Sequence, residues 1–149
     1  MPPRNILVPV DGSIHAINAV SYADDLADKC GANLNLLHVL QPEESYILPE
    51  HLEKLVEETG GAKSEADRIL AAAMDRIALC DRARISKETR EGDPAGEILK
   101  FCREKGIDLI VMGNRGMGDL KGLLLGSVSH KVVQVAECPC LLYRESLEA

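Results

Sequence analysis

Aromatic residues are scarce in this chain, whose 149 residues include one phenylalanine, three tyrosines and no tryptophan. Positive charge is scarce as well, because 17 lysines and arginines face 24 aspartates and glutamates and leave a formal net charge of -7. Nucleic-acid binding depends on a basic face and, for single strands, on stacking aromatics. We therefore expect no nucleic-acid partner.

Long apolar runs are also missing, and none approaches the roughly 20 residues that cross a bilayer. The first run, Ile6–Val10, ends at Asp11 and is too short for the core of a secretory signal peptide. We expect a cytoplasmic protein without membrane contact, whose cysteines stay reduced. The length, with 46% hydrophobic and 28% charged residues, predicts one globular domain over residues 1–149.

Metal-ligating pairs are few. Cys138 and Cys140 flank one proline and could hold a soft metal, but no second cysteine or histidine pair lies at ligand spacing to complete a tetrahedral site. Metal binding is therefore the weaker interpretation of this pair. Cys30, Cys80 and Cys102 fall on the apolar faces of predicted helices, which favours burial over chemistry.

Short apolar runs alternate with amphipathic stretches from end to end. The periodicity predicts strands at Ile6–Val10, Leu34–Leu40, Arg84–Glu91, Leu109–Met112 and Pro139–Tyr143. Helices are predicted between them, after the Asp11–Ser13 turn, over Ala62–Leu79, from Pro94 to Gly106 and from Val128. This order predicts an α/β fold with a doubly wound parallel sheet and helices on both faces.

Two segments depart from the regular pattern. Arg84–Glu91 is largely polar, which indicates a sheet edge. Residues 41–61 carry two prolines and six glutamates against one lysine, and we interpret them as a mobile acidic loop.

Glycines gather in Gly113–Ser127, between a predicted strand and the last predicted helix. Backbone N–H groups of such a loop can approach an anion closely, with the positive end of the helix dipole behind them. The stretch from Gly113 to Lys131 is locally basic, because Arg115, Lys121 and Lys131 face Asp119 alone. Phosphate is the anion that we expect.

The common phosphate signatures are absent from this loop. No glycine precedes a Lys-Ser or Lys-Thr pair as in a P-loop, and the dinucleotide pattern Gly-x-Gly-x-x-Gly fails at Lys121. What remains is Gly-x2-Gly-x9-Gly-Ser at Gly113, Gly116, Gly126 and Ser127. On spacing alone, a simple turn is an equally good interpretation.

Five motifs, taken in order, resemble the universal stress protein family. They are Ile-Leu-Val-Pro-Val-Asp-Gly-Ser at 6–13, Leu-His-Val at 37–39, Asp-Leu-Ile-Val-Met-Gly-Asn-Arg-Gly at 108–116, Leu-Leu-Gly-Ser-Val-Ser at 124–129 and Cys-Pro-Cys-Leu at 138–141. The glycine spacing marks the ATP-binding branch of that family. The resemblance implies a five-stranded, Rossmann-like sheet in the order 3-2-1-4-5, of the adenine nucleotide alpha hydrolase-like type, and a homodimer through the C-terminal strand.

The resemblance also implies a site for ATP and Mg²⁺. Adenine would lie near Val39 and the end of the first strand, Asp11 would face the ribose or the magnesium ion, and Arg115 would be a charge partner of the phosphates. Capping of the first helix is an equally good role for Asp11, and His38 and His130 receive no catalytic role. The implied site residues are Pro9, Val10, Asp11, Val39, Met112, Gly113, Arg115, Gly116, Gly126, Ser127, Val128 and Ser129.

Three functions stay open. A nucleotide-dependent regulatory or stress-response module is favoured. A slow ATPase or phosphotransfer enzyme would need a base beside the γ-phosphate, and neither Asp11 nor Asp119 is an assured one. A ligand-free interaction scaffold is the third possibility, against which the complete glycine spacing argues.

Overall fold

The computed structural model describes residues 1–42, 61–116, 122 and 124–144. The predicted acidic loop at 41–61 lies almost wholly outside these residues, and so do Asp119 and Lys121.

Five parallel strands form the sheet, in the order β3-β2-β1-β4-β5, which confirms the predicted fold. The strands are β1 (Asn5–Pro9), β2 (Asn33–Leu40), β3 (Ile85–Glu91), β4 (Leu109–Gly113) and β5 (Cys140–Tyr143). Polar β3 is an edge strand, as predicted.

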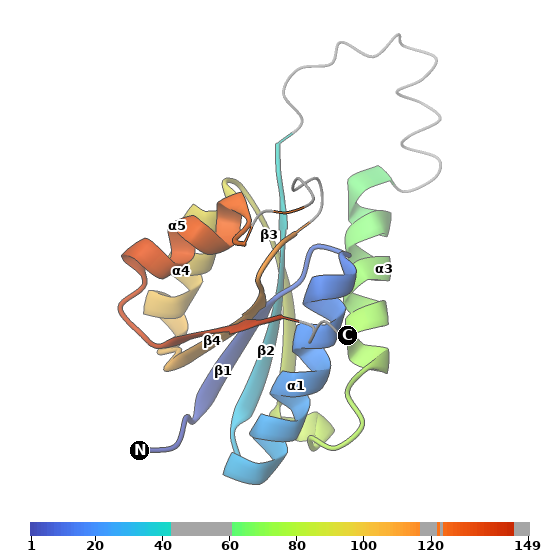
Figure 1. Cartoon of the computed structure of the whole chain (residues 1–149). Helices are drawn as coiled ribbons and strands as arrows, with labels where there is room; N and C mark the ends of the chain where they lie inside the picture. Colours follow the sequence, from blue (N-terminus) through green and yellow to red (C-terminus); the bar gives the residue numbers. More distant parts are fainter. Residues whose placement is uncertain (43–60, 117–121, 123, 145–149) are drawn as a thin grey trace, which may run out of the picture.

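In the described part of the chain, helices cover both faces of the sheet (Figure 1). Helices α1 (Ile14–Cys30) and α3 (Gly61–Asp75) lie on one side, and α4 (Pro94–Lys105) and α5 (Ser127–Val135) lie on the other. A short 3-10 helix, η1 (Arg82–Arg84), precedes β3. None of the helices in the described part of the chain combines the length and hydrophobicity that a bilayer crossing needs.

Side chains of alternate residues on the central strands pack into two separate cores, one on each face of the sheet. On β1, Ile6 and Val8 face α1, whereas Leu7 faces α4 and α5. This alternation follows from the two-residue period of a strand. Helix α1 packs closely because its buried face carries small side chains, namely Ala16, Ala19, Val20, Ala23 and Ala27.

The C-terminal end of α3 differs from the prediction. The helix ends at Asp75 rather than Leu79, so Ile77 and Cys80 lie in the following turn. The cause is Asp24, a carboxylate on α1 that is 3% exposed and accepts hydrogen bonds from the backbone N–H groups of residues 78, 79 and 80. These bonds replace helical ones, which periodicity alone does not reveal.

The order of the strands reverses at β1, since β2 follows on one side of it and β4 on the other. In open parallel sheets, ligands bind beyond the carboxyl ends of the strands at this position. A ligand site is therefore expected at the carboxyl ends of β1, β2 and β4.

Candidate functional site

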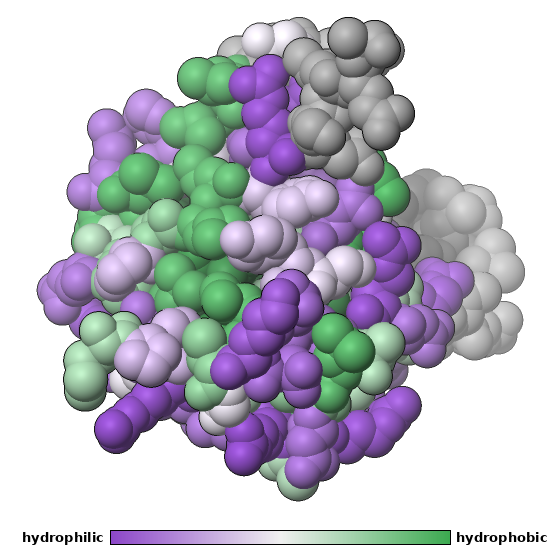
Figure 2. Space-filling view, turned by 60° about the horizontal axis from the view of Figure 1, so that its bottom comes forward, coloured by the Kyte–Doolittle hydropathy of each residue, from purple (hydrophilic) through white to green (hydrophobic). Residues whose placement is uncertain are grey.

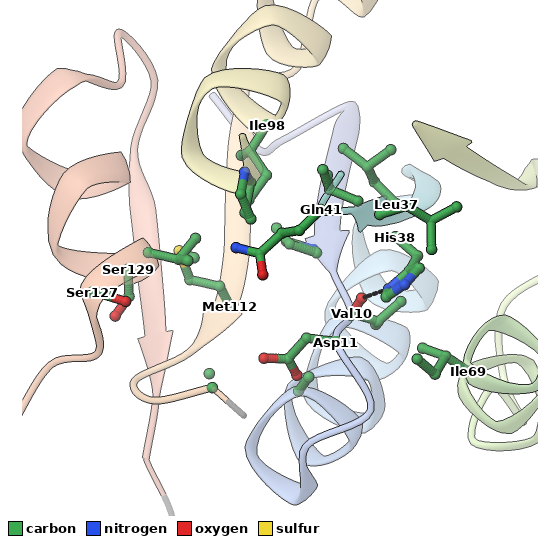
Figure 3. A pocket seen from close by; sticks show the side chains of 18 of the residues that line it. Val10, Asp11, Leu37, His38, Gln41, Ile69, Ile98, Met112, Ser127 and Ser129 are labelled. Carbon is green, nitrogen blue, oxygen red and sulfur yellow. Dashed lines mark hydrogen bonds between the residues drawn. The ribbon is translucent and has the colours of Figure 1, made fainter. Parts of the chain in front are cut away.

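A pocket of about 380 Å³ opens beyond the carboxyl ends of β1, β2 and β4 (Figure 3). This volume lies within the range of roughly 300–1,000 Å³ that is usual for small-molecule sites. All the residues that the family resemblance implied line it except Gly126. It is also lined by Ala16, Leu37, His38, Leu40, Gln41, Glu65, Ile69, Pro94 and Ile98.

The turn between β1 and α1 forms one wall of the pocket. The Val10 N–H donates to the Leu37 carbonyl at 2.8 Å, and the Val10 carbonyl lies 2.7 Å from Nδ1 of His38. Because a carbonyl can only accept, Nδ1 of His38 is the donor. His38, which is 8% exposed, is thus a hydrogen-bonded buried histidine that fixes this turn.

Asp11 follows in the same turn and points into the pocket (Figure 3). One carboxylate oxygen accepts a hydrogen bond from the Ser13 N–H at 2.9 Å. The cap of α1 is Ser13, whose hydroxyl accepts from the Ala16 N–H, so the alternative in which Asp11 caps the helix is wrong.

Gly113, at the end of β4, is a glycine for a packing reason. A Cβ there would lie 2.8 Å from both the backbone carbonyl carbon and the Cβ of His15, in the first turn of α1. Only a bare residue lets α1 approach β4 so closely. The packing of α1 on β4 therefore requires glycine at this position, whether or not a ligand is bound.

The glycine-rich loop is closed by its own hydrogen bonds. The Gly126 N–H donates to the Asn114 carbonyl at 2.7 Å, and the Ser129 hydroxyl lies 3.0 Å from that carbonyl and 3.1 Å from the Gly126 carbonyl. The Gly126 amide and the Ser129 hydroxyl, both at implied site residues, are therefore already used within the protein. Ser127 and Val128, at the N-terminus of α5, line the pocket with the positive end of that helix.

Arg115 adds a positive charge to the lining of the pocket. Its Nε is buried and finds no hydrogen-bond acceptor among the residues that the structure describes. A buried donor without an acceptor costs roughly 1–3 kcal/mol, and more when it is charged. The guanidinium group would attract an anion to this end of the pocket.

A second, smaller pocket of about 260 Å³ is lined by residues of α4 and by the segment around the end of α5. Cys102 and Cys138 both line it. Burial raises the pKa of the Cys102 thiol to about 12 and also raises the pKa values of Cys138 and Cys140. These thiols are therefore protonated at neutral pH, which disfavours thiolate chemistry. No cluster of three or more potential metal ligands occurs in the described part of the chain.

Several lining residues escaped the sequence analysis. Pro94 and Ile98 begin the helix after β3, and Gln41 follows β2 directly. Their positions after strand ends could have identified them, because helix N-termini gather at the same edge of such a sheet. No comparable signal points to Ile69 or Glu65, which reach the pocket from α3.

Fold and site together define the class of protein: a small α/β protein with a doubly wound parallel sheet and a ligand-sized pocket where the strand order reverses. The family model described as the universal stress protein family matches residues 3–144. Universal stress protein YxiE of Bacillus subtilis is 38% identical over 153 residues, covering 95% of this chain and 99% of that protein. The chain belongs to the universal stress protein family.

Solved structures agree with this assignment. Universal stress protein UspA from Lactobacillus plantarum superimposes with a TM-score of 0.79 at 29% identity, covering 95% of this chain and 97% of that one. A universal stress protein solved in complex with cAMP superimposes with a TM-score of 0.73 at 26% identity, covering 98% of this chain and all of the other.

Proposed function

We propose that this chain is an ATP-binding regulatory module of the stress response, in which nucleotide occupancy changes how the protein binds its partners. The observation that carries the proposal is the cation Arg115, which lines the main pocket and whose buried Nε finds no acceptor among the described residues. Together with the N-terminus of α5, it favours an anion at that end of the pocket.

The rest of the pocket suits an adenine nucleoside. Apolar side chains of Val10, Leu37, Ile98 and Met112 line it and offer walls for a flat base. Asp11 points into the same space and is a candidate ligand for the ribose hydroxyls or for Mg²⁺ (Figure 3). The related structure in complex with cAMP supports an adenine nucleotide. We expect a dissociation constant of about micromolar. The cytoplasmic location stays a prediction.

A homodimer through β5 is a second part of the proposal. This strand forms an edge of the sheet, and within the described residues it pairs with β4 alone. Its four residues are all half-buried. The face seen in Figure 2 carries a band of apolar side chains among polar ones. An apolar strand edge is stabilised by pairing, and two such edges would meet antiparallel about a two-fold axis.

Titration calorimetry tests nucleotide binding. Wild-type protein with Mg²⁺ should bind ATP more tightly than adenosine or GTP. Arg115→Gln should weaken ATP binding by about tenfold or more, because a hydrogen bond to a charged group is lost. Arg103→Gln, at the second pocket, is the matched control and should bind ATP like the wild type. Equal or absent heats for all three ligands would refute the proposal.

A further inference from the structure

Asn114 holds together the two ends of the glycine-rich loop. It follows β4 directly and is 6% exposed. Its N–H donates to the Tyr143 carbonyl at 3.1 Å, which fixes it to the end of β5. Its carbonyl accepts from the Gly126 N–H and the Ser129 hydroxyl, at the far end of the loop.

The side chain of Asn114 makes a further bond across the loop. Its Nδ2 lies 3.1 Å from the Leu124 carbonyl, which can only accept, so the amide nitrogen is the donor. Its Oδ1 is buried and finds no partner within the described residues. The side-chain bond therefore joins the end of β4 to the segment that precedes α5.

The consequence for the pocket follows from the neighbours of these residues. Arg115 and Gly116 come directly after Asn114, and Ser127 comes directly after Gly126. All three line the main pocket, whereas Asn114 is outside the lining. These bonds therefore hold Arg115 and Gly116, on one side of the pocket, and Ser127, on the other, in place before a ligand binds.

We propose that Asn114 is a positioning residue for the phosphate groups of the bound nucleotide, an inference that rests on the proposed ATP site. Without these bonds, Arg115 and Ser127 would have to be brought into place during binding, at a cost in conformational entropy. A nucleoside makes no phosphate contacts, so its binding does not depend on this loop. Asn114 thus determines preference for nucleotides over nucleosides.

The variant Asn114→Leu tests the inference, because leucine has the same branched shape and removes both the donor and the unpaired acceptor. The Leu124 carbonyl loses its donor, so the free energy of unfolding should fall, by no more than the cost of one unpaired carbonyl. By calorimetry, its ATP affinity should fall about five- to tenfold, the effect of one lost hydrogen bond, while its adenosine affinity should change by less than about twofold.

Asn35→Leu is the matched control. The Asn35 Nδ2 also donates to a backbone carbonyl at 3.1 Å, that of Ile6, away from the lining of the main pocket. This variant should bind ATP like the wild type. If Asn114→Leu does not fold, Asn114→Ala also lacks the donor, adds no charge and should show the same split between ATP and adenosine.

Two results would overturn the inference alone: unchanged ATP affinity in a folded Asn114 variant, or equal losses for ATP and adenosine. A wild-type protein that binds ATP no better than adenosine would overturn the proposed function itself, and the inference with it.

Discussion

Replacing Gly113 by alanine should destabilise the protein even without nucleotide. The new Cβ would lie 2.8 Å from two atoms of His15 and 3.0 Å from its carbonyl oxygen, where ordinary contacts begin near 3.4 Å. Two of these atoms belong to the backbone, so the first turn of α1 must move by roughly half an ångström or more. Overpacking of this kind costs about 1–3 kcal/mol. The φ angle of Gly113 is not positive, so the effect is purely one of contact.

Thermal unfolding followed by circular dichroism measures this effect. For a domain of this size, about 2 kcal/mol lowers the melting temperature by roughly 4–8 °C. Gly96→Ala is the control. Its Cβ would lie 3.2 Å from Oδ2 of Asp93, the N-cap of α4, which needs to shift by only a few tenths of an ångström, and alanine favours a helix. That variant should melt at the wild-type temperature or higher. A Gly113→Ala protein that melts like the wild type would refute the packing role of this glycine.

Three further outcomes are expected. Asp24→Asn should lower the free energy of unfolding in urea by about 3 kcal/mol, since buried N–H groups lose a charged acceptor. Asp25→Asn breaks only the exposed pair with Lys29 and should barely change the urea concentration at the unfolding midpoint. Equal effects of the two substitutions would contradict this reasoning. Cys102 has a pKa of about 12 against an ordinary 9.0, so its thiol should be alkylated about 1,000-fold more slowly at pH 8 in folded than in unfolded protein. The free energy of unfolding should fall as the pH rises above 9. Fast alkylation of Cys102 in the folded protein would contradict the burial of this thiol. Leu142→Lys should shift the mass in light scattering from dimer to monomer, and a wild-type monomer at micromolar concentration would disprove the β5 interface.

The sequence was sufficient for most of the fold because each element carries its own local signal. The run Ile6–Val10 predicted a strand, and the segment from Pro94 to Gly106 predicted a helix, with bounds within a residue or two of those observed. The exception, the end of α3, depends on Asp24, which is more than fifty residues away in the sequence. Contacts of that range leave no periodic pattern.

The candidate site was predictable in its location and less so in its chemistry. The carboxyl ends of β1 and β4 bring Asp11 and Gly113 together, as the topology requires. The glycine spacing, however, could not show that the Gly126 amide closes the loop, because that bond depends on where Asn114 lies. The same spacing is compatible with a loop held open for phosphate and with one closed on itself.

The most direct test of ATP binding at the main pocket is a nuclear magnetic resonance titration of ¹⁵N-labelled protein with ATP and Mg²⁺. The account predicts saturable shifts in the amide signals of Val10, Val39, Gly116 and Ser127, with little change around Cys102 and Cys138. An unchanged spectrum, or shifts confined to the second pocket, would contradict it.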